Sequence, residues 1–190
     1  MLFSKQIPAF IFFVMILFSQ TLIADEYRNI DWIELMPKDD LEALSNPPEY
    51  LDQIEDGSFE DQISSQLQSA LETAADDKYQ QALVSTKVVK TFDNQKIRLP
   101  GFIVPIEFDD QYRVTEFFLV PFFGACIHAP PPPPNQIIYA KYDKGFAQVG
   151  LYAAYWLTGT LHISLTENDI ATSAYTIDIN SIEPYKEGDN

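Results

Sequence analysis

The sequence predicts a mainly β protein with N-terminal helices (α+β), built as a small antiparallel, OB-like Greek-key barrel with one packed amphipathic helix. From residue 85 onward, runs rich in Val, Ile, Phe, Tyr and Thr alternate in twos and are separated by short turns. Before residue 85 the chain is acidic, and apolar residues recur there every four positions. Hydrophobic residues make up 46% of the chain, which is enough to form a core.

The first 24 residues have the layout of a secretory signal peptide. Lys5 supplies a positive start, an apolar run covers residues 7–18, and Ala24 precedes an acidic pair. A proline and a Ser-Gln pair interrupt the apolar stretch, which is shorter than the roughly 20 residues of a membrane span. We therefore expect cleavage after Ala24, with an uncleaved anchor as the alternative. Cleavage predicts a periplasmic protein without a membrane span, and Cys126 lies too far away to carry an N-terminal lipid.

The charge balance excludes several classes of partner. The chain has 28 acidic and 12 basic residues, a formal net charge of −16. Lys5 is the one charged residue of the expected signal peptide, so the mature chain has a charge of −17. Nucleic acid and anionic lipid both require a basic surface, which this composition does not supply. The acidity indicates a soluble, monomeric protein, and a single cysteine excludes a disulfide framework.

The segment 25–84 is expected to be acidic and helical. Residues 32–37 form a short turn or hydrophobic clasp, and Pro at the end of this motif suits the start of a helix over 38–44. The sequence Asn-Pro-Pro at 46–48 ends that helix. A longer amphipathic helix is predicted over 59–80, packed on the β region or, alternatively, binding a partner. Its apolar stripe consists of Phe59, Ile63, Leu67 and Leu71.

The segment 85–190 is expected to form the barrel domain. Pro105 and Pro121 lie within strand-like runs, so they should mark strand edges or bulges. Gly159 is expected to help a long strand bend across the barrel, and Asp93-Asn94 suits a hairpin turn. The predicted strands are 86–91, 96–106, 113–120, 136–142, 149–165 and 174–179.

Five consecutive prolines, Pro130, Pro131, Pro132, Pro133 and Pro134, precede Asn135 and Gln136. Such a run forms a stiff polyproline II segment of about 15 Å, at about 3.1 Å per residue. One interpretation is a rigid crossover between two strands. The other is a displayed ridge, including Asn135 and Gln136, that binds an aromatic groove on a partner protein.

Cys126 and His128 form the candidate metal site. Side chains two residues apart on an extended segment point to the same face, and a thiolate with an imidazole suits zinc or copper. A complete site needs another ligand. Glu116 is the first candidate, with His162, Glu107 and Asp109 as further ones.

Two alternatives to metal binding remain open for this pair. Cys126 could be a small buried hydrophobic residue, with His128 holding the polyproline turn through a hydrogen bond. The pair could instead support nucleophilic or redox chemistry. The sequence contains no complete catalytic motif and no second cysteine. We therefore expect a protein that is not an enzyme, with no cofactor other than zinc.

Several strings in the chain resemble an uncharacterised family of exported bacterial proteins, classed as a domain of unknown function. The most specific is Gly-Ala-Cys-Ile-His-Ala followed by five prolines and Asn-Gln, at residues 124–136. Residues 99–107, 116–121, 32–37, 156–161 and 173–175 carry the rest of the resemblance.

The resemblance implies a periplasmic protein, often encoded beside an ABC exporter of the macrolide/lipoprotein type and sometimes in zinc-responsive gene sets. Other members often have a basic residue at the position of His162, which makes it the less favoured ligand. The leading hypothesis is thus a periplasmic accessory or binding protein that works with an inner-membrane ABC exporter. Zinc would be held by Cys126, His128 and Glu116. The alternatives are a metal-free interaction module that uses the polyproline ridge, and a cysteine-dependent enzyme.

Overall fold

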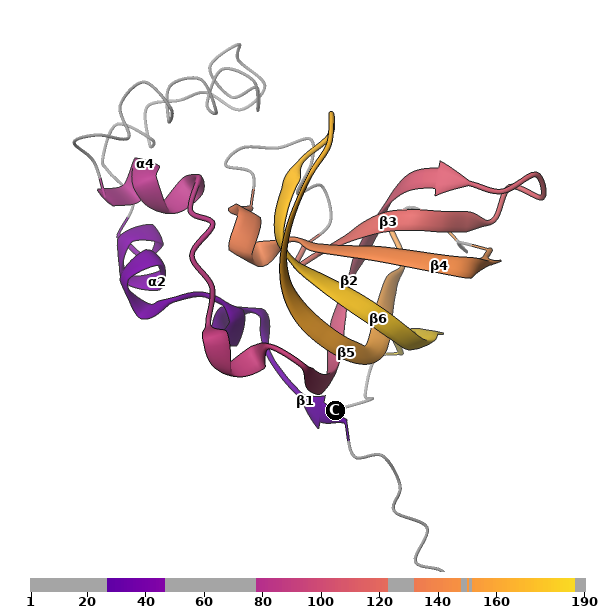
Figure 1. The fold of residues 1–190 in the computed structure, drawn as a ribbon, viewed down its shortest axis with the longest axis horizontal. Helices are drawn as coiled ribbons and strands as arrows, with labels where there is room; N and C mark the ends of the chain where they lie inside the picture. The colour runs from indigo at the N-terminus through magenta and orange to yellow at the C-terminus, as the bar shows by residue number, and fades with distance from the viewer. Residues whose placement is uncertain (1–26, 47–77, 123–131, 148–149, 151, 187–190) are drawn as a thin grey trace, which may run out of the picture.

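The computed structural model describes residues 27–46, 78–122, 132–147, 150 and 152–186. In this part of the chain the strands form a barrel, and the short helices gather at one end of it (Figure 1). The elements in chain order are β1 (Arg28–Asn29), η2 (Trp32–Leu35), α2 (Lys38–Leu44), α4 (Lys78–Leu83), η4 (Lys90–Phe92), β2 (Gln95–Phe108), β3 (Val114–Val120), η5 (Pro134–Gln136), β4 (Ile138–Phe146), β5 (Ala154–Glu167) and β6 (Thr172–Pro184).

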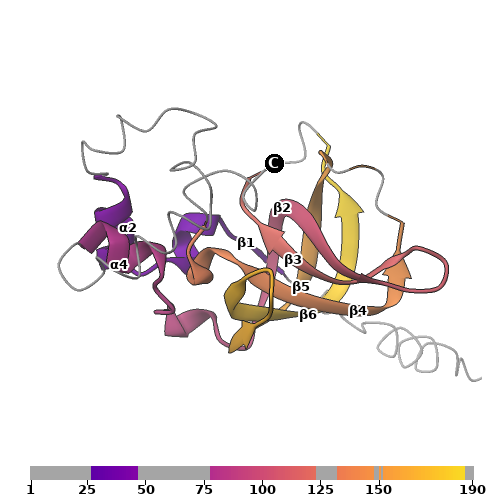
Figure 2. The same ribbon diagram turned by 90° about the horizontal axis from the view of Figure 1, so that it is seen from above.

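Five strands close into a ring in the order β2–β3–β4–β6–β5, because β5 pairs back onto β2. All neighbours are antiparallel except β4 and β6, which are parallel over Ile138–Lys141 and Tyr175–Asp178. Beyond Lys141 and Asp178 these two strands diverge (Figures 1 and 2). β1 lies outside the ring, parallel to the start of β2. The predicted mainly β class and closed barrel are confirmed, whereas the expectation of an antiparallel sheet is wrong for β4 and β6.

The inside of the ring is filled by side chains that alternate along each strand, with a change of parity where the register shifts, as between Val114 and Phe117. Alternation places successive residues on opposite faces of a strand, so each strand contributes every second residue to the interior. Phe146 makes edge-to-face contacts with Phe117 and Tyr155, at ring-centroid distances of 5.6 and 5.8 Å. Other fully buried members of this core are Ile97, Leu99, Leu119, Ile138, Leu157, Leu161 and Tyr175.

The structure has an irregularity or a strand end at all three predicted positions, Pro105, Pro121 and Gly159. The β2–β3 register shifts between Pro105 and Glu107, so Pro105 lies at a bulge, and Pro121 directly follows the end of β3. Gly159 lies at a shift in the β5–β6 register. A Cβ atom at Gly159 would lie 2.4 Å from the carbonyl oxygen of Asp178, so only glycine permits this close approach of the two strands.

The N-terminal predictions were partly right. The helix predicted over 38–44 is α2, and η2 takes the place of the expected turn or clasp. Most of the helix predicted over 59–80 lies outside the described residues, and the described end of it, α4, continues to Leu83. The strand predicted over 86–91 is wrong, because this segment is irregular and ends in η4.

Side chains of the barrel end hold the N-terminal segment in place. Tyr175 Oη donates to the carbonyl of Leu35 at 2.9 Å and accepts from the amide of Val89 at 2.8 Å. Trp32 Nε1 donates to the carbonyl of Pro100 at 2.7 Å. The amide of Val89 is bonded to a side chain and is therefore not available to a neighbouring strand, and residues 86–91 pair with no strand. None of the helices in the described part of the chain reaches the length and hydrophobicity that a membrane crossing requires.

Candidate functional site

The outside of the barrel carries a second apolar layer across β2, β3 and β4, which we call the outer face. Phe118 and Val120 belong to it and are 0% and 1% exposed, although they point away from the barrel interior. Its other apolar members are Phe102, Val104, Ile106, Ile137, Tyr139 and Ala171. Most outward-facing positions of a small barrel are polar, so an apolar row here requires an explanation.

The strand register aligns the outer face into rows. Val104 lies directly opposite Phe118, and Phe118 lies opposite Tyr139, so the three side chains form one row across the three strands. The rings of Phe118 and Tyr139 meet edge to face with centroids 6.0 Å apart. The neighbouring row places Phe102 opposite Val120. The apolar part of the outer face is therefore continuous across the three strands.

The next row of the outer face is charged. Glu107 of β2 lies opposite Glu116 of β3, and Glu116 lies opposite Lys141 of β4. Lys141 Nζ is 3.0 Å from Glu116 Oε1, and the hydroxyl of Tyr139 also donates to the Glu116 carboxylate. Tyr139 thus belongs to the apolar rows through its ring and to the charged row through its hydroxyl group.

The pKa values at this row reflect the same contacts. Burial would raise the pKa of Glu116, but the hydrogen bonds from Lys141 and Tyr139 outweigh it, so the pKa is lowered. Burial, followed by the hydrogen bond to Glu116, raises the pKa of Tyr139 to about 12. The hydrogen bond to Glu116 raises the pKa of Lys141. At neutral pH the row therefore holds a carboxylate, an ammonium group and a protonated phenol.

The sequence-predicted metal ligands are not brought together among the described residues. Cys126 and His128, together with Pro130 and Pro131, lie outside them. Glu116 is described, and its carboxylate would have to give up Lys141 and Tyr139 to bind a metal. Within the described ranges, no group of three or more His, Cys, Asp and Glu side chains is arranged to hold a metal ion.

The further ligand candidates have other partners or positions. His162 Nε2 is 3.0 Å from Asp178 Oδ2, on β5 and β6, which are not neighbours of β3. Asp109 organises the β2–β3 turn, since its carboxylate accepts from the backbone amides of Gln111 and Arg113, each at 2.9 Å. Glu107 alone of these three lies beside Glu116.

The residues predicted for partner binding face their own chain where they are described. Asn135 is 0% exposed, and its Nδ2 donates to Asp40 Oδ2 and to the carbonyl of Lys87, each at 3.0 Å. Gln136 Nε2 donates to the carbonyl of Trp32 at 2.8 Å. Pro132 and Pro133 are buried, and Pro134 begins η5. This part of the polyproline segment and the Asn-Gln pair connect the barrel to the N-terminal segment.

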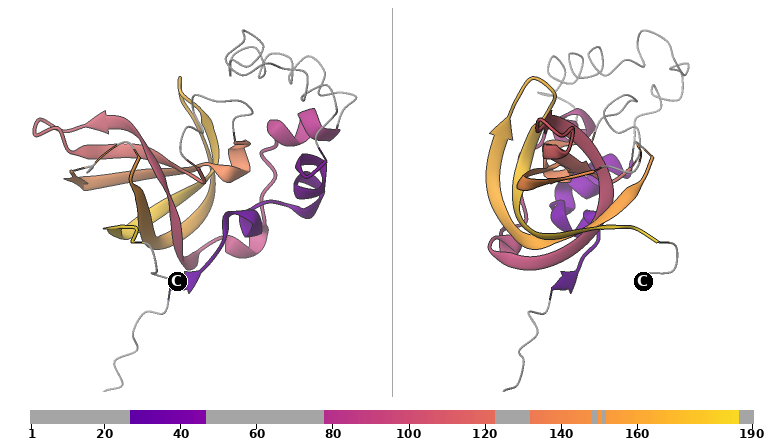
Figure 3. Two further views of the ribbon diagram at one scale, coloured as in Figure 1. Left: turned by 180° about the vertical axis from the view of Figure 1, so that it is seen from behind. Right: turned by 90° about the vertical axis from the view of Figure 1, so that its right-hand side faces the viewer.

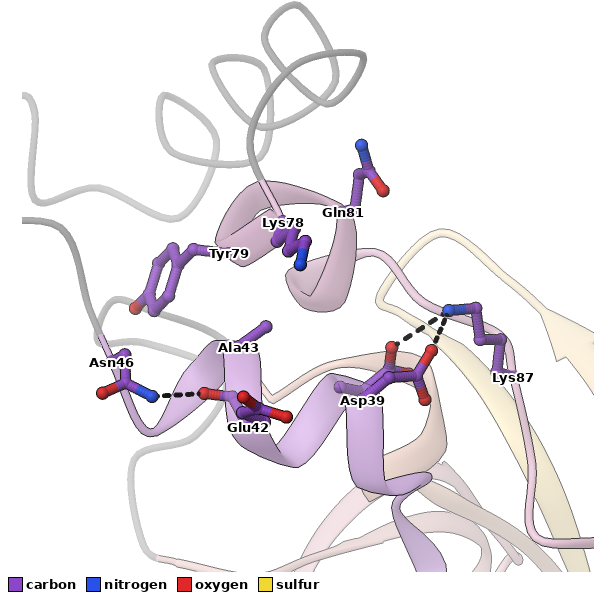
Figure 4. Close-up of a pocket in the computed structure, with 9 residues that line it drawn as sticks. Asp39, Glu42, Ala43, Asn46, Lys78, Tyr79, Gln81 and Lys87 are labelled. Carbon is purple, nitrogen blue, oxygen red and sulfur yellow. Dashed lines mark hydrogen bonds and ion pairs between the residues drawn. The ribbon is translucent and has the colours of Figure 1, made fainter.

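A polar pocket of about 530 Å³ lies between α2 and α4 (Figure 4). Lys87 lies at its edge, with its Nζ 2.6 Å from Asp39 Oδ2 and 3.4 Å from Asp40 Oδ1. Glu42 and Lys78 also line it. Its two aspartates are already paired within the chain, so we place the candidate site at the outer face. The helices that form the pocket lie at the other end of the molecule from the free ends of β3 and β4 (Figure 3).

One signal in the sequence could have revealed the outer face. Residues 101–106 and 117–120 are apolar at both parities, whereas a strand with one solvent-facing side alternates. Such runs indicate that both faces of β2 and β3 are apolar. The pairing of Glu116 with Lys141 was not predictable in the same way, because it depends on the β3–β4 register.

Comparison with known proteins places the chain beside one family and one solved structure. Residues 32–184 match the model of a family described as "Protein of unknown function (DUF3299)". A crystal structure of a DUF3299 family protein from Pseudomonas aeruginosa PAO1 is similar, with 32% sequence identity and a TM-score of 0.59. The match covers 85% of this chain and 97% of that one. Among curated proteins, no relative matches the sequence.

Proposed function

Because the chain belongs to the DUF3299 family of proteins of unknown function, we propose a function from its own surface. The protein is an exported binding or accessory protein of the bacterial periplasm, and it docks a partner protein on its outer face. The observation that carries this proposal is the apolar outer face of β2, β3 and β4, which ends in a row of charged side chains.

The topology of the barrel supports this choice of surface. The ring order β2–β3–β4–β6–β5, with its parallel β4–β6 pair, suits an OB-type barrel. OB folds bind their ligands on the face of the second and third barrel strands and on the adjoining loops. The second and third strands of this ring are β3 and β4. Ala171, in the turn between β5 and β6, packs against the same face. This argument is one of fold analogy.

Export is part of the proposal and has its own test. The layout of residues 1–24 predicts removal of this segment on translocation. N-terminal sequencing of the protein recovered from a periplasmic extract should begin at Asp25. Recovery of the chain from the cytoplasm with Met1 intact would contradict the periplasmic assignment.

The partner we propose is an ABC exporter of the inner membrane. A photo-reactive phenylalanine analogue placed at Val104 should cross-link the exporter in living cells, and the adduct should be identified by mass spectrometry. The control position is Glu42, an exposed residue on α2. An adduct with the exporter at Val104 and none at Glu42 is the expected result. The same adducts at both positions, or none of the exporter's peptides at Val104, would contradict this partner.

Zinc binding by Cys126 and His128 is a separate proposal, and it rests on the sequence. The two residues belong to the connection between β3, which ends at Val120, and β4, which follows Ile137, and both Val120 and Ile137 are members of the outer face. The test is elemental analysis of the exported protein and of its Cys126→Ser/His128→Ala variant. One zinc ion per chain, lost in the variant, is the expected result, and equal zinc content in both proteins would refute it.

A further inference from the structure

We propose that the ligand of the outer face is a basic, amphipathic peptide segment. Its apolar side chains would lie over Phe102 and Val104, and a lysine or arginine would reach Glu107. This inference rests on the proposed function, because it names the chemistry of the partner at the same surface.

The charged row has more negative than positive groups. Glu107 and Glu116 lie directly opposite each other on β2 and β3, and like charges in such a pair are destabilising. Lys141 is the cation that approaches them, and its electrostatic neighbours include Asp143 as well as both glutamates. Three carboxylates thus surround one ammonium group.

Of these three carboxylates, Glu107 is the one that a partner can bind. Glu116 is engaged with Lys141 at 3.0 Å and with the hydroxyl of Tyr139. Glu107 is exposed, and the structure gives its carboxylate no ion pair among the described residues. A cation placed beside Glu107 would relieve the repulsion within the row, which is the kind of charge complementarity that gives interfaces their specificity.

The apolar rows next to this carboxylate define the other half of the ligand. Phe102, Val104, Ile106 and Tyr139 are partly exposed, while Phe118, which lies between Val104 and Tyr139 in their row, is fully buried. Removing these partly exposed apolar side chains from water favours association, and this contribution does not depend on a precise contact geometry. An extended segment with an apolar residue at one position and a basic residue two positions later presents both side chains on one face, about 7 Å apart, which matches the spacing of successive rows along the strands.

The net charge of the whole chain also favours a positively charged ligand. A formal charge of −16 attracts cationic segments over distances of several ångströms to about 10 Å at moderate ionic strength. It repels nucleic acids and anionic lipid headgroups. A neutral, purely apolar ligand is the remaining occupant, and the experiment separates it from a basic one.

The experiment uses the exported protein and three fluorescein-labelled peptides of equal length. In the first, the Leu-Lys peptide, every second residue is leucine or lysine in turn, with serine between them, so that both lie on one face of an extended segment. The second, the Leu-Glu peptide, has glutamate in place of lysine, and the third, the Ser-Lys peptide, has serine in place of leucine. Binding is followed by fluorescence anisotropy at low and at physiological salt. We expect the Leu-Lys peptide to bind most tightly, and its affinity to fall as salt rises. Equal affinity for the Leu-Glu peptide would overturn the requirement for a basic segment, and equal affinity for the Ser-Lys peptide would overturn the apolar contact.

Matched variants locate the binding on the outer face. Glu107→Gln and Glu42→Gln each remove one exposed negative charge, the first from the outer face and the second from α2. Val104→Thr and Ile33→Thr each replace an apolar side chain, the first on the outer face and the second on η2. Glu107→Gln and Val104→Thr should each weaken binding about five-fold or more, and the Glu42 and Ile33 variants less than two-fold. Equal losses at both places would show non-specific attraction and overturn the inference.

The outcomes also separate this inference from the proposed function. If the exporter cross-links at Val104 but the Leu-Lys peptide binds no better than the Leu-Glu peptide, the basic segment is wrong and the docking face stands. If the Leu-Lys peptide binds in a Glu107-dependent way and no exporter adduct forms, the ligand chemistry stands and the exporter is wrong.

Discussion

The side chain of Tyr139 takes part in both the apolar contacts and the charged contacts of the outer face. Its ring packs against Phe118, and its hydroxyl donates to Glu116, whose carboxylate also binds Lys141. A phenol in this position stabilises the carboxylate and is itself hard to ionise, because burial raises its pKa and deprotonation would also place a phenolate beside two glutamates. The charged row therefore keeps its geometry over a wide pH range.

This arrangement predicts the ionisation of Tyr139. Its pKa of about 12 lies above the ordinary value of 10.0, so the folded state holds the proton more tightly than the unfolded chain. The stability it contributes is fully present below pH 10 and is lost as the pH rises through about 12. By NMR of labelled tyrosine rings, the signal that disappears in Tyr139→Phe should still be protonated at about pH 11. Deprotonation near pH 10 would contradict the burial of the Tyr139 hydroxyl and its hydrogen bond to Glu116.

Tyr175 has a comparable role at the barrel end. Its hydroxyl accepts from the Val89 amide and donates to the Leu35 carbonyl, and its side chain is 0% exposed. Tyr175→Phe should lower the free energy of unfolding by about 1–3 kcal/mol, because two backbone groups lose their partner away from water. Urea denaturation measures the change. Tyr112→Phe is the control, since Tyr112 is 88% exposed, and an equal loss in both variants would refute the role of the Tyr175 hydroxyl.

At the scale of elements, the β5–β6 pair depends on one glycine. Gly159→Ala would place a Cβ 2.4 Å from the Asp178 carbonyl oxygen and 2.9 Å from Ile177 Cγ1. We expect a loss of about 1–3 kcal/mol in the free energy of unfolding, because the backbone of β6 must move to admit the methyl group. Gly150→Ala is the matched control, since nothing lies within 4 Å of the added atom there. It should be neutral or slightly stabilising, and a Gly159→Ala protein as stable as this control would contradict the close approach.

The elements also show which parts of the fold could be predicted from sequence. Five of the six predicted strands overlap β2 to β6, because alternation and turn residues are local signals. The strand predicted over 86–91 failed, since its β-branched residues suit a strand while a distant side chain, Tyr175, uses its backbone. β1 was missed because a two-residue strand has no periodicity. A barrel was expected from the number of strands, their short turns and the presence of only one substantial helix. The parallel β4–β6 pair was not predictable in this way, because it depends on the chain crossover between non-consecutive strands.

The site was less predictable than the strands for a related reason. Glu116 was chosen as a metal ligand because it is a carboxylate that lies, like Cys126 and His128, within the strings that resemble the family. The register instead sets it opposite Lys141, which comes twenty-five residues later. Asn135 and Gln136 were chosen as surface residues, and tertiary packing buries both. In each case the partner of the side chain is distant in sequence, so no local pattern could identify it.

At the scale of the whole molecule, repulsion among the acidic groups destabilises the folded state, while local ion pairs stabilise it. The described ion pairs are mostly exposed at one or both ends, and such pairs contribute only about 0–1 kcal/mol each. A net charge of −16 gives repulsion among many uncompensated groups. Screening shortens the range of that repulsion from about 30 Å at 0.01 M salt to about 3 Å at 1 M salt. The repulsive contribution should therefore dominate the response of the fold to salt.

Raising NaCl from about 10 mM to about 500 mM should thus raise the urea midpoint of unfolding at neutral pH, because screening weakens repulsion more than it weakens the exposed pairs. The same series near pH 4.2, the isoelectric point of the sequence, is the control, and there the stabilisation should shrink or change sign. Equal stabilisation at both pH values would indicate a general salting effect in place of charge screening. Binding of a basic segment should respond in the opposite direction, since salt weakens attraction across the outer face while it strengthens the fold. Weaker binding in salt at constant or rising stability would therefore report on the interface itself and not on loss of the folded protein.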